Sequence, residues 1–245
     1  HGLGAAQTGR NRHGRRAWRI LQRPNRHVQD SSLLENRFGI SHDGHWQGSK
    51  IPYARGGGAR AGTRICGPDQ DGVTDGQNMK ILGICGSLQA VSTNLELLHH
   101  AARLMPAGMT LSIYDGLRDL PHFNLDLEKI AVPPSVARLR EEIASSAALL
   151  IASPEYGYSL PGSLKNAIDW LIGSGELECK IIGVTASTTS PERGRMGLDA
   201  LSTTLRAVKA RMVGGTPIAR GPTFEAELQT FVTALVAEIH REIVE

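Results

Sequence analysis

Long apolar runs and cysteines are scarce in this chain of 245 residues, and each absence narrows what the protein can be. No apolar run is long enough to cross a bilayer, and the start lacks the pattern of a secretion signal. The three cysteines are an odd number without metal-ligand spacing, as is typical of single thiols in a reducing compartment. We therefore expect a cytoplasmic protein with no membrane partner and no metal site.

Charge is divided unevenly along the chain. Residues 1–78 hold 12 of the 27 Lys and Arg and 6 of the 24 Asp and Glu, which gives a charge of +6. The remaining 15 basic and 18 acidic groups give residues 79–245 a charge of −3. The first segment also holds 14 of the 28 glycines and few branched aliphatic residues, so it cannot bury enough apolar surface to offset its chain entropy.

These properties predict a basic, Gly/Arg-rich extension over residues 1–78 that is largely disordered. It could even be translated sequence that lies upstream of a start at Met79. An RNA-binding arm and an organelle transit peptide are the alternatives, the latter because no acid precedes Asp30. We do not expect nucleic acid as a partner, because the arginines and glycines are not interleaved with aromatic residues.

After Met79 the pattern changes to short apolar runs that alternate with helical stripes. The apolar runs predict strands at residues 80–84, 109–115, 148–153, 180–187 and 215–219. Apolar residues at helical spacing predict helices at Leu95 to Met105, Val136 to Ile143, after Pro161, Met196–Met212 and from Thr223. We therefore expect an α/β fold over residues 79–245, a flavodoxin-like doubly wound sheet of five parallel strands with helices on both faces. Ligands of such sheets bind beyond the carboxyl ends of the strands.

The loop between the first strand and the first helix reads "CGSLQAVSTN" (85–94). Its polar groups are the hydroxyls of Ser87, Ser92 and Thr93 and the amide of Asn94. The free N–H groups and the dipole at a helix start favour an anion, and Gly86 allows close approach of a ligand to the backbone. The loop therefore predicts a phosphate site, with a plain N-cap by Ser92 or Thr93 as the alternative.

Three other kinds of nucleotide or phosphate loop do not fit this segment. A Walker loop requires Gly-Lys-Ser/Thr, and no such triplet follows the first strand. A low-molecular-weight tyrosine phosphatase requires an arginine six positions after its nucleophile, but Val91 lies six positions after Cys85. A Rossmann domain requires G-x-G-x-x-G, which is also missing here.

The loop after the third strand reads "SPEYGYSLPGSLKNAIDW" (153–170). Pro154 ends the strand, and Gly157 allows the backbone to approach a flat ligand closely. Tyr156 and Tyr158 can form an aromatic wall, so the loop predicts a site for a flat heteroaromatic group. The alternative is that these aromatic residues only close the end of the core.

Together, "GSLQAVSTN", "LPHFNLDLE" (120–128) and "SPEYGYSLPGSLKNAIDW" resemble the NADPH-dependent FMN reductase family over about residues 79–215. That family contains flavin, quinone, chromate and azo-dye reductases with a flavodoxin-like fold. The resemblance implies an enzyme with bound FMN and with NADPH or NADH as co-substrate. It also implies a small-molecule electron acceptor (a quinone, free flavin, azo dye or metal oxyanion) and a homodimer or homotetramer.

The resemblance further implies which residues hold the flavin. Its phosphate would be bound by Ser87, Gln89, Ser92 and Asn94, its isoalloxazine would be lined by Pro154, Glu155, Tyr156 and Gly157, and Ser187 would make a further contact. No catalytic acid or nucleophile is implied, because the flavin carries the chemistry.

Three positions depart from the family pattern. Gln89 stands where an arginine is usual, Gly157 where an asparagine is usual, and residues 188–197 contain glycine only at positions 194 and 197. The acids Asp126 and Glu128 are expected on an exposed loop without a catalytic role.

Two other functions fit the same residues. A flavodoxin-like electron carrier would bind FMN without using a nicotinamide, but such carriers usually show a strongly acidic docking face, unlike residues 79–245 with their charge of −3. A non-enzymatic FMN or redox-sensing protein would bind nucleic acid through the basic extension.

Overall fold

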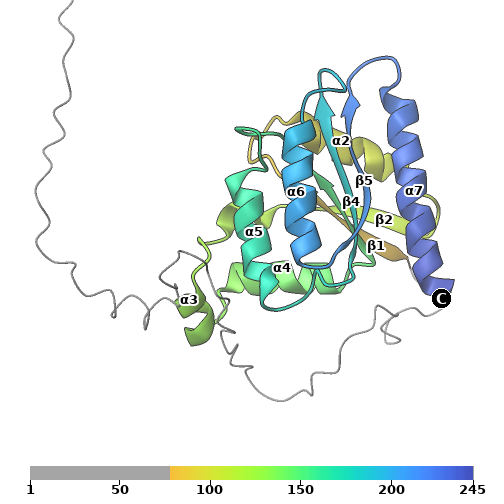
Figure 1. Cartoon of the computed structure of the whole chain (residues 1–245). Helices are drawn as coiled ribbons and strands as arrows, with labels where there is room; N and C mark the ends of the chain where they lie inside the picture. Colours follow the sequence, from red (N-terminus) through yellow and green to blue (C-terminus); the bar gives the residue numbers. More distant parts are fainter. Residues whose placement is uncertain (1–77, 245) are drawn as a thin grey trace, which may run out of the picture. The chain divides into compact units, whose positions relative to one another are not determined.

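The computed structural model of the chain describes residues 78–244. The prediction made for residues 1–78 therefore lies outside the described part, except at Asn78. The described part consists of one sheet with helices packed on its two faces (Figure 1).

The sheet has five parallel strands. They are β1 (Met79–Cys85), β2 (Met109–Tyr114), β3 (Ala148–Ala152), β4 (Ile181–Thr188) and β5 (Arg211–Ala219), in the order β2-β1-β3-β4-β5. This is the predicted flavodoxin-like doubly wound order. The chain reverses its direction of winding between β1 and β3, so the switch point lies where these two strands end.

Helices cover both faces of the sheet (Figure 1). One layer contains α2 (Thr93–Arg103) and α7 (Phe224–Val244), and the other contains α4 (Pro134–Ala144), α5 (Gly162–Ile172) and α6 (Arg195–Ala207). Successive strand residues serve opposite layers, because side chains alternate along a strand. Leu149 packs with α4 to α6, whereas Leu150 packs with α2 and α7. All of β3 is buried, which explains its continuous apolar run.

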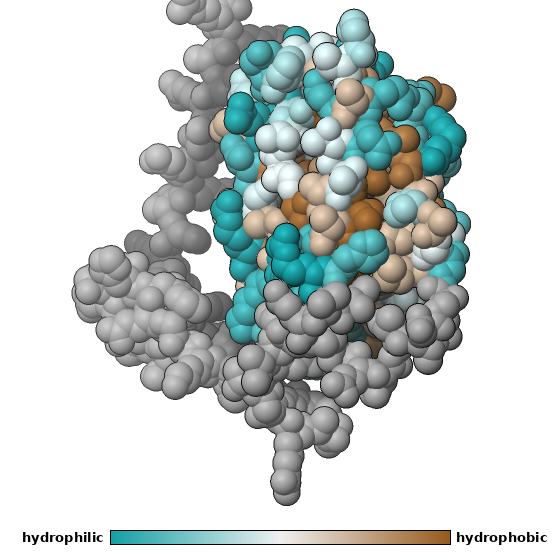
Figure 2. Space-filling view, turned by 90° about the vertical axis from the view of Figure 1, so that its right-hand side faces the viewer, coloured by the Kyte–Doolittle hydropathy of each residue, from teal (hydrophilic) through white to brown (hydrophobic). Residues whose placement is uncertain are grey.

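Seen from the side of α7, the described surface has hydrophobic residues gathered near its middle and hydrophilic residues around them (Figure 2). None of the helices within residues 78–244 combines the length and the apolar character that a membrane crossing requires.

Residues 116–130 form more regular structure than predicted. A 3₁₀ helix, η1 (Gly116–Asp119), and a short helix, α3 (Leu125–Ile130), precede α4. The side chain of Asn124 caps α3 by accepting a hydrogen bond from the N–H of Asp126 at 2.9 Å. The predicted loop around Asp126 and Glu128 is therefore a helix, whereas the predicted exposure is confirmed for Asp126, whose side chain is 83% exposed. Glu128 is mostly buried and bonds the guanidinium of Arg140 at 2.7 Å.

The boundary between α6 and β5 also differs from the prediction. The helix ends at Ala207 and not at Met212, and the strand begins at Arg211 and not at residue 215. A left-handed residue, Lys209 with φ of 58°, reverses the chain, and the N–H of Arg211 then bonds the carbonyl of Lys180 at 3.0 Å. The two glycines at positions 214 and 215 have φ of 83° and 102° and lie beside a register shift, so they interrupt the apolar pattern inside the strand.

The cysteines fit the prediction of single thiols only in part. Cys85 is a free thiol that is buried at the end of β1. Cys179 is disulfide-bonded, so the prediction is wrong for this residue. Cysteine usage therefore does not support the predicted reducing compartment.

Candidate functional site

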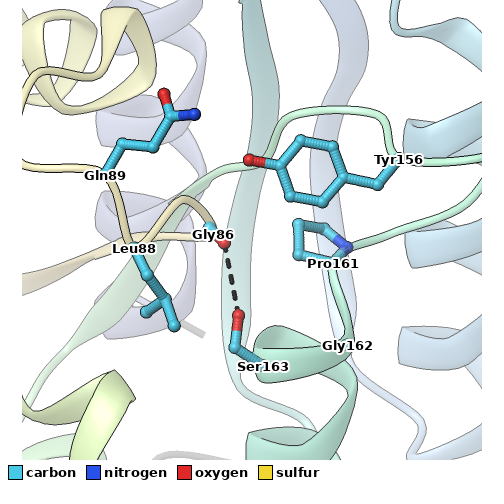
Figure 3. Close-up of a pocket in the computed structure, with 7 residues that line it drawn as sticks. All are labelled: Gly86, Leu88, Gln89, Tyr156, Pro161, Gly162 and Ser163. Carbon is cyan, nitrogen blue, oxygen red and sulfur yellow. Dashed lines mark hydrogen bonds between the residues drawn. The ribbon is translucent and has the colours of Figure 1, made fainter.

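The loops after β1 and β3 touch at the carboxyl edge of the sheet, at the switch point. The N–H of Gly86 bonds the carbonyl of Ala152 at 2.9 Å. A Cβ atom at position 86 would lie 3.1 Å from Ser153 Oγ and 3.2 Å from Pro154 Cδ, so only glycine fits here without displacing the second loop. The hydroxyl of Ser163, at the start of α5, donates to the carbonyl of Gly86 at 3.5 Å (Figure 3).

A cavity of about 390 Å³ opens between these two loops and the start of α5. It is lined by Gly86, Leu88, Gln89, Tyr156, Pro161, Gly162 and Ser163 (Figure 3). The hydroxyl end of Tyr156 points toward the first loop, and the ring of Pro161 lies next to the tyrosine ring (Figure 3). The volume is in the range of small-molecule sites, which is about 300–1,000 Å³. The two predicted loops therefore share one cavity.

The first loop leaves the start of α2 without a side-chain cap. Ser92 occupies the N-cap position, but its side chain makes no capping hydrogen bond, and its hydroxyl lies 3.7 Å from the sulfur of Cys85. The hydroxyl of buried Ser87 accepts from the N–H of Gln89 at 3.3 Å. A plain N-cap is thus not observed, and the first N–H groups of α2 stay available to an anion.

Asn94 and Ser187 connect α2 to the end of β4. The side-chain oxygen of Asn94 accepts from the N–H of Ser187 at 2.9 Å, and both residues are buried. The amide nitrogen of Asn94 makes no hydrogen bond within residues 78–244, so it is the group that could bind a ligand. This bond holds Asn94 and Ser187, two of the predicted site residues, next to each other.

The loop after β3 forms a tight hairpin at the mouth of the cavity. Tyr156 and Ser159 exchange backbone hydrogen bonds of 2.9 and 3.1 Å, and the residues between them, Gly157 and Tyr158, have φ of 56° and 60°. Two positive φ values between paired residues are typical of a type I′ turn. Gly157 adopts this conformation easily, whereas Tyr158 is held in it and is 75% exposed.

The side chain of Glu155 bonds another loop of the candidate site. Its carboxylate accepts from the N–H of Gly197 at 2.9 Å, in the first turn of α6. A negative group is favourable at that helix end. The side chain of Glu155 therefore ties the loops after β3 and β4 together. Gly197 was not predicted as a site residue, although it is one of only two glycines in residues 188–197.

Residues 86–94 carry no charged side chain. The arginines near this loop therefore come from other segments of the chain. Arg118, from η1, donates to the carbonyl of Leu88 at 3.1 Å. Arg220, after β5, lines a second hollow of about 240 Å³ together with Ser187 and with Thr93, the first residue of α2. In the loop after β4, a hydrogen bond from Ser190 lowers the pKa of Glu192 below its usual value.

Not all nine predicted cofactor residues face a cavity. Gln89 and Tyr156 line the larger cavity, and Ser187 lines the smaller hollow. The others lie in the adjacent loops, where Ser87, Ser92 and Asn94 are buried, Pro154 and Glu155 are half-buried and Gly157 is exposed. No sequence pattern points to Leu88 or Arg220, since neither residue type is specific to a flavin site.

The sequence model of the NADPH-dependent FMN reductase family matches residues 79–221. The chain belongs to this family. The matched residues run from β1 to the loop after β5, so every loop of the candidate site lies within the FMN reductase match.

Curated relatives of this FMN reductase family member align over part of their length. An NAD(P)H-dependent FMN reductase of Pseudomonas aeruginosa is 42% identical over 120 residues, which are 49% of this chain and 63% of the relative. An NAD(P)H:quinone oxidoreductase of Solanum tuberosum is 43% identical over 96 residues, 38% of this chain and 49% of the relative. The quinone reductase of Escherichia coli K12 is 33% identical over 96 residues, 39% of this chain and 51% of the relative. The chain thus spans about half to two thirds of the length of these relatives.

The chain is also similar to a solved structure. The flavoenzyme NAD(P)H:(acceptor) oxidoreductase of Paracoccus denitrificans superposes with a TM-score of 0.60 at 28% identity. The superposition covers 67% of this chain and 98% of that chain, so the described part of this family member has that protein's fold.

Proposed function

We propose that the protein is an NAD(P)H-dependent FMN reductase that reduces small-molecule acceptors of the quinone or flavin class. The observation that carries the proposal is the cavity shared by the loops after β1 and β3, at the switch point, in a chain of this family. The relatives' names provide the reaction class, since they are FMN and quinone reductases.

The residues present suit FMN. The α2 start has N–H groups without a side-chain acceptor, and hydroxyl and amide groups lie around it, which suits a phosphate. The glycine-dependent contact at Gly86 and the half-exposed ring of Tyr156 suit a flat group in the cavity. Ser87, Gln89, Ser92 and Asn94 would hold the phosphate, Pro154 to Gly157 would line the ring system, and Ser187 would contribute its hydroxyl.

Bound FMN would supply the redox chemistry, accepting hydride from NADPH or NADH and passing electrons to the acceptor. The chain would bind and orient it. The backbone N–H groups of Glu155 and Gly157 make no hydrogen bond within the described residues, so they are donors for a polar ring edge. Fixed donors of this kind stabilise negative charge that develops during a reaction. Tyr156 would position the flat face and shield it from water.

We also propose a homodimer or homotetramer, as the family resemblance implies. Val91 and Ile130 are each 83% exposed, and Tyr158 on the hairpin is 75% exposed. A second copy could cover apolar side chains of this kind.

The test is to add FMN to the purified full chain, record its visible spectrum, and titrate NADPH without oxygen. We expect a yellow protein that NADPH bleaches and that a quinone then reoxidises. A protein that stays colourless with FMN would contradict the proposal. A yellow protein that oxidises neither NADPH nor NADH would favour the flavodoxin-like electron carrier or the redox sensor.

A further inference from the structure

The smaller hollow of about 240 Å³ lies between α2, the ends of β4 and β5, and the start of α7. It is lined by Thr93, Glu96, His100, Ser187, Arg220, Gly221 and Phe224. Thr93 is the first residue of α2, so the loop that lines the larger cavity with Gly86 and Gln89 leads to the hollow at its other end.

Three polar groups of this hollow lack partners. Ser187 is only 8% exposed, yet its hydroxyl makes no hydrogen bond within the described part of the chain. Thr93 follows an N-cap residue that makes no side-chain capping bond. The guanidinium of Arg220 forms no ion pair within residues 78–244, although its backbone N–H is fixed on the carbonyl of Thr188 at 2.9 Å. Ser187 lines the hollow, so its free hydroxyl can bond a ligand there.

The chemistry of these groups selects an anion. A guanidinium, a helix N-terminus and hydroxyl groups together suit a phosphate, which arginine binds through two parallel hydrogen bonds. The acid and the imidazole of the hollow lie further along α2. Glu96 and His100 are roughly 4.5 and 10 Å along the helix axis from Thr93, and the ring of His100 already contacts Glu225 at 2.8 Å. The end of the hollow that suits a phosphate is therefore the end next to the sheet.

We infer that Thr93, Ser187 and Arg220 form a phosphate-monoester subsite in which Arg220 supplies the positive charge. This inference rests on the proposed function. Two phosphate monoesters belong to that reaction, the phosphate of FMN and the 2′-phosphate of NADPH. Arg118 is the other arginine beside the loop, but it already donates to the carbonyl of Leu88.

The first experiment compares FMN with riboflavin, which lacks the phosphate, by fluorescence titration of the full chain. Arg220→Ala should weaken FMN binding by roughly tenfold or more, as expected for a hydrogen-bonded charge pair, and leave riboflavin binding within about twofold. Arg220→Lys keeps the charge but loses the fork, so its affinity should be intermediate. Arg103→Ala is the matched control, because this exposed arginine lies in the last turn of α2, at the opposite end of that helix from Thr93.

The second experiment distinguishes the two phosphates. If the subsite takes the 2′-phosphate, Arg220→Ala leaves the FMN-to-riboflavin ratio unchanged and lowers the NADPH-to-NADH ratio of kcat/KM by roughly tenfold. If Arg220→Ala changes neither ratio, the inference is overturned while the proposed function stands. If the wild-type chain binds neither flavin, the proposed function itself fails. Arg220 is exposed, so the thermal midpoint should not change, and a matching midpoint shows that the variant folds.

Discussion

Tyr114, the last residue of β2, has a buried hydroxyl without a hydrogen-bond partner among the described residues. The side chain is 5% exposed, and its hydroxyl has no hydrogen-bond partner within residues 78–244. Burial raises the pKa of this phenol above its usual value of 10.0, while the Arg138 guanidinium, 5.5 Å from the ring centre, acts in the opposite direction. An unpaired buried hydroxyl is less favourable than the same space filled by an apolar ring.

We therefore expect Tyr114→Phe to keep or raise the free energy of unfolding near pH 8, unlike most core substitutions. The wild-type chain should lose stability as the pH rises above about 10. The sign follows because the unfolded tyrosine ionises first, so alkaline pH favours the unfolded chain until the raised folded pKa is passed. Urea unfolding of both proteins at neutral and alkaline pH measures this. A loss of more than about 1 kcal/mol near neutral pH would mean that the hydroxyl is bonded.

At the scale of elements, the hairpin after β3 and the start of α6 are held as one unit. The Glu155 carboxylate bonds the N–H of Gly197, and the two backbones approach closely. A Cβ atom at position 197 would lie 3.0 Å from Glu155 Cα and 3.1 Å from the carbonyl oxygen of Ser159. Both neighbours are backbone atoms, which cannot move aside cheaply.

Gly197→Ala should therefore lower the free energy of unfolding by about 1–3 kcal/mol and weaken FMN binding, because the hairpin that carries Tyr156 is displaced. Chemical unfolding and flavin titration measure the two effects. Asp199→Ala, at an exposed position of the same helix, is the control and should change neither. Unchanged stability in Gly197→Ala would contradict the close approach.

The elements differ in how well the sequence predicts them. Fully buried strands such as β3 are predicted well, because every residue is apolar. The start of β5 is missed, because Gly214 and Gly215 make a bulge inside it. In the site, the sequence locates both loops, since their glycines and hydroxyls follow strands. It does not predict that Glu155 bonds Gly197 or that Arg220 and Ser187 line one hollow, because both arrangements bring together residues far apart in the chain.

At the scale of the whole molecule, we propose that residues 79–245 form the complete flavin-binding domain. The sheet, both helix layers and every loop of the site lie within these residues. A protein that consists of residues 79–245 should therefore unfold cooperatively and bind FMN within about twofold of the full chain. Thermal unfolding and flavin titration of both proteins check this. Retention of the full chain on RNA that falls with added salt, and is lost without residues 1–78, would instead support a nucleic-acid role for that segment.

The hydrogen bond between Asn94 and the N–H of Ser187 has a consequence for how a ligand meets this protein. It holds the start of α2 against the end of β4 without a ligand, so the groups proposed to surround a phosphate are already in place. Most of the ordering that a tight complex requires has then been completed during folding. Flavin would then bind to a preformed site, without a loop that has to close over it.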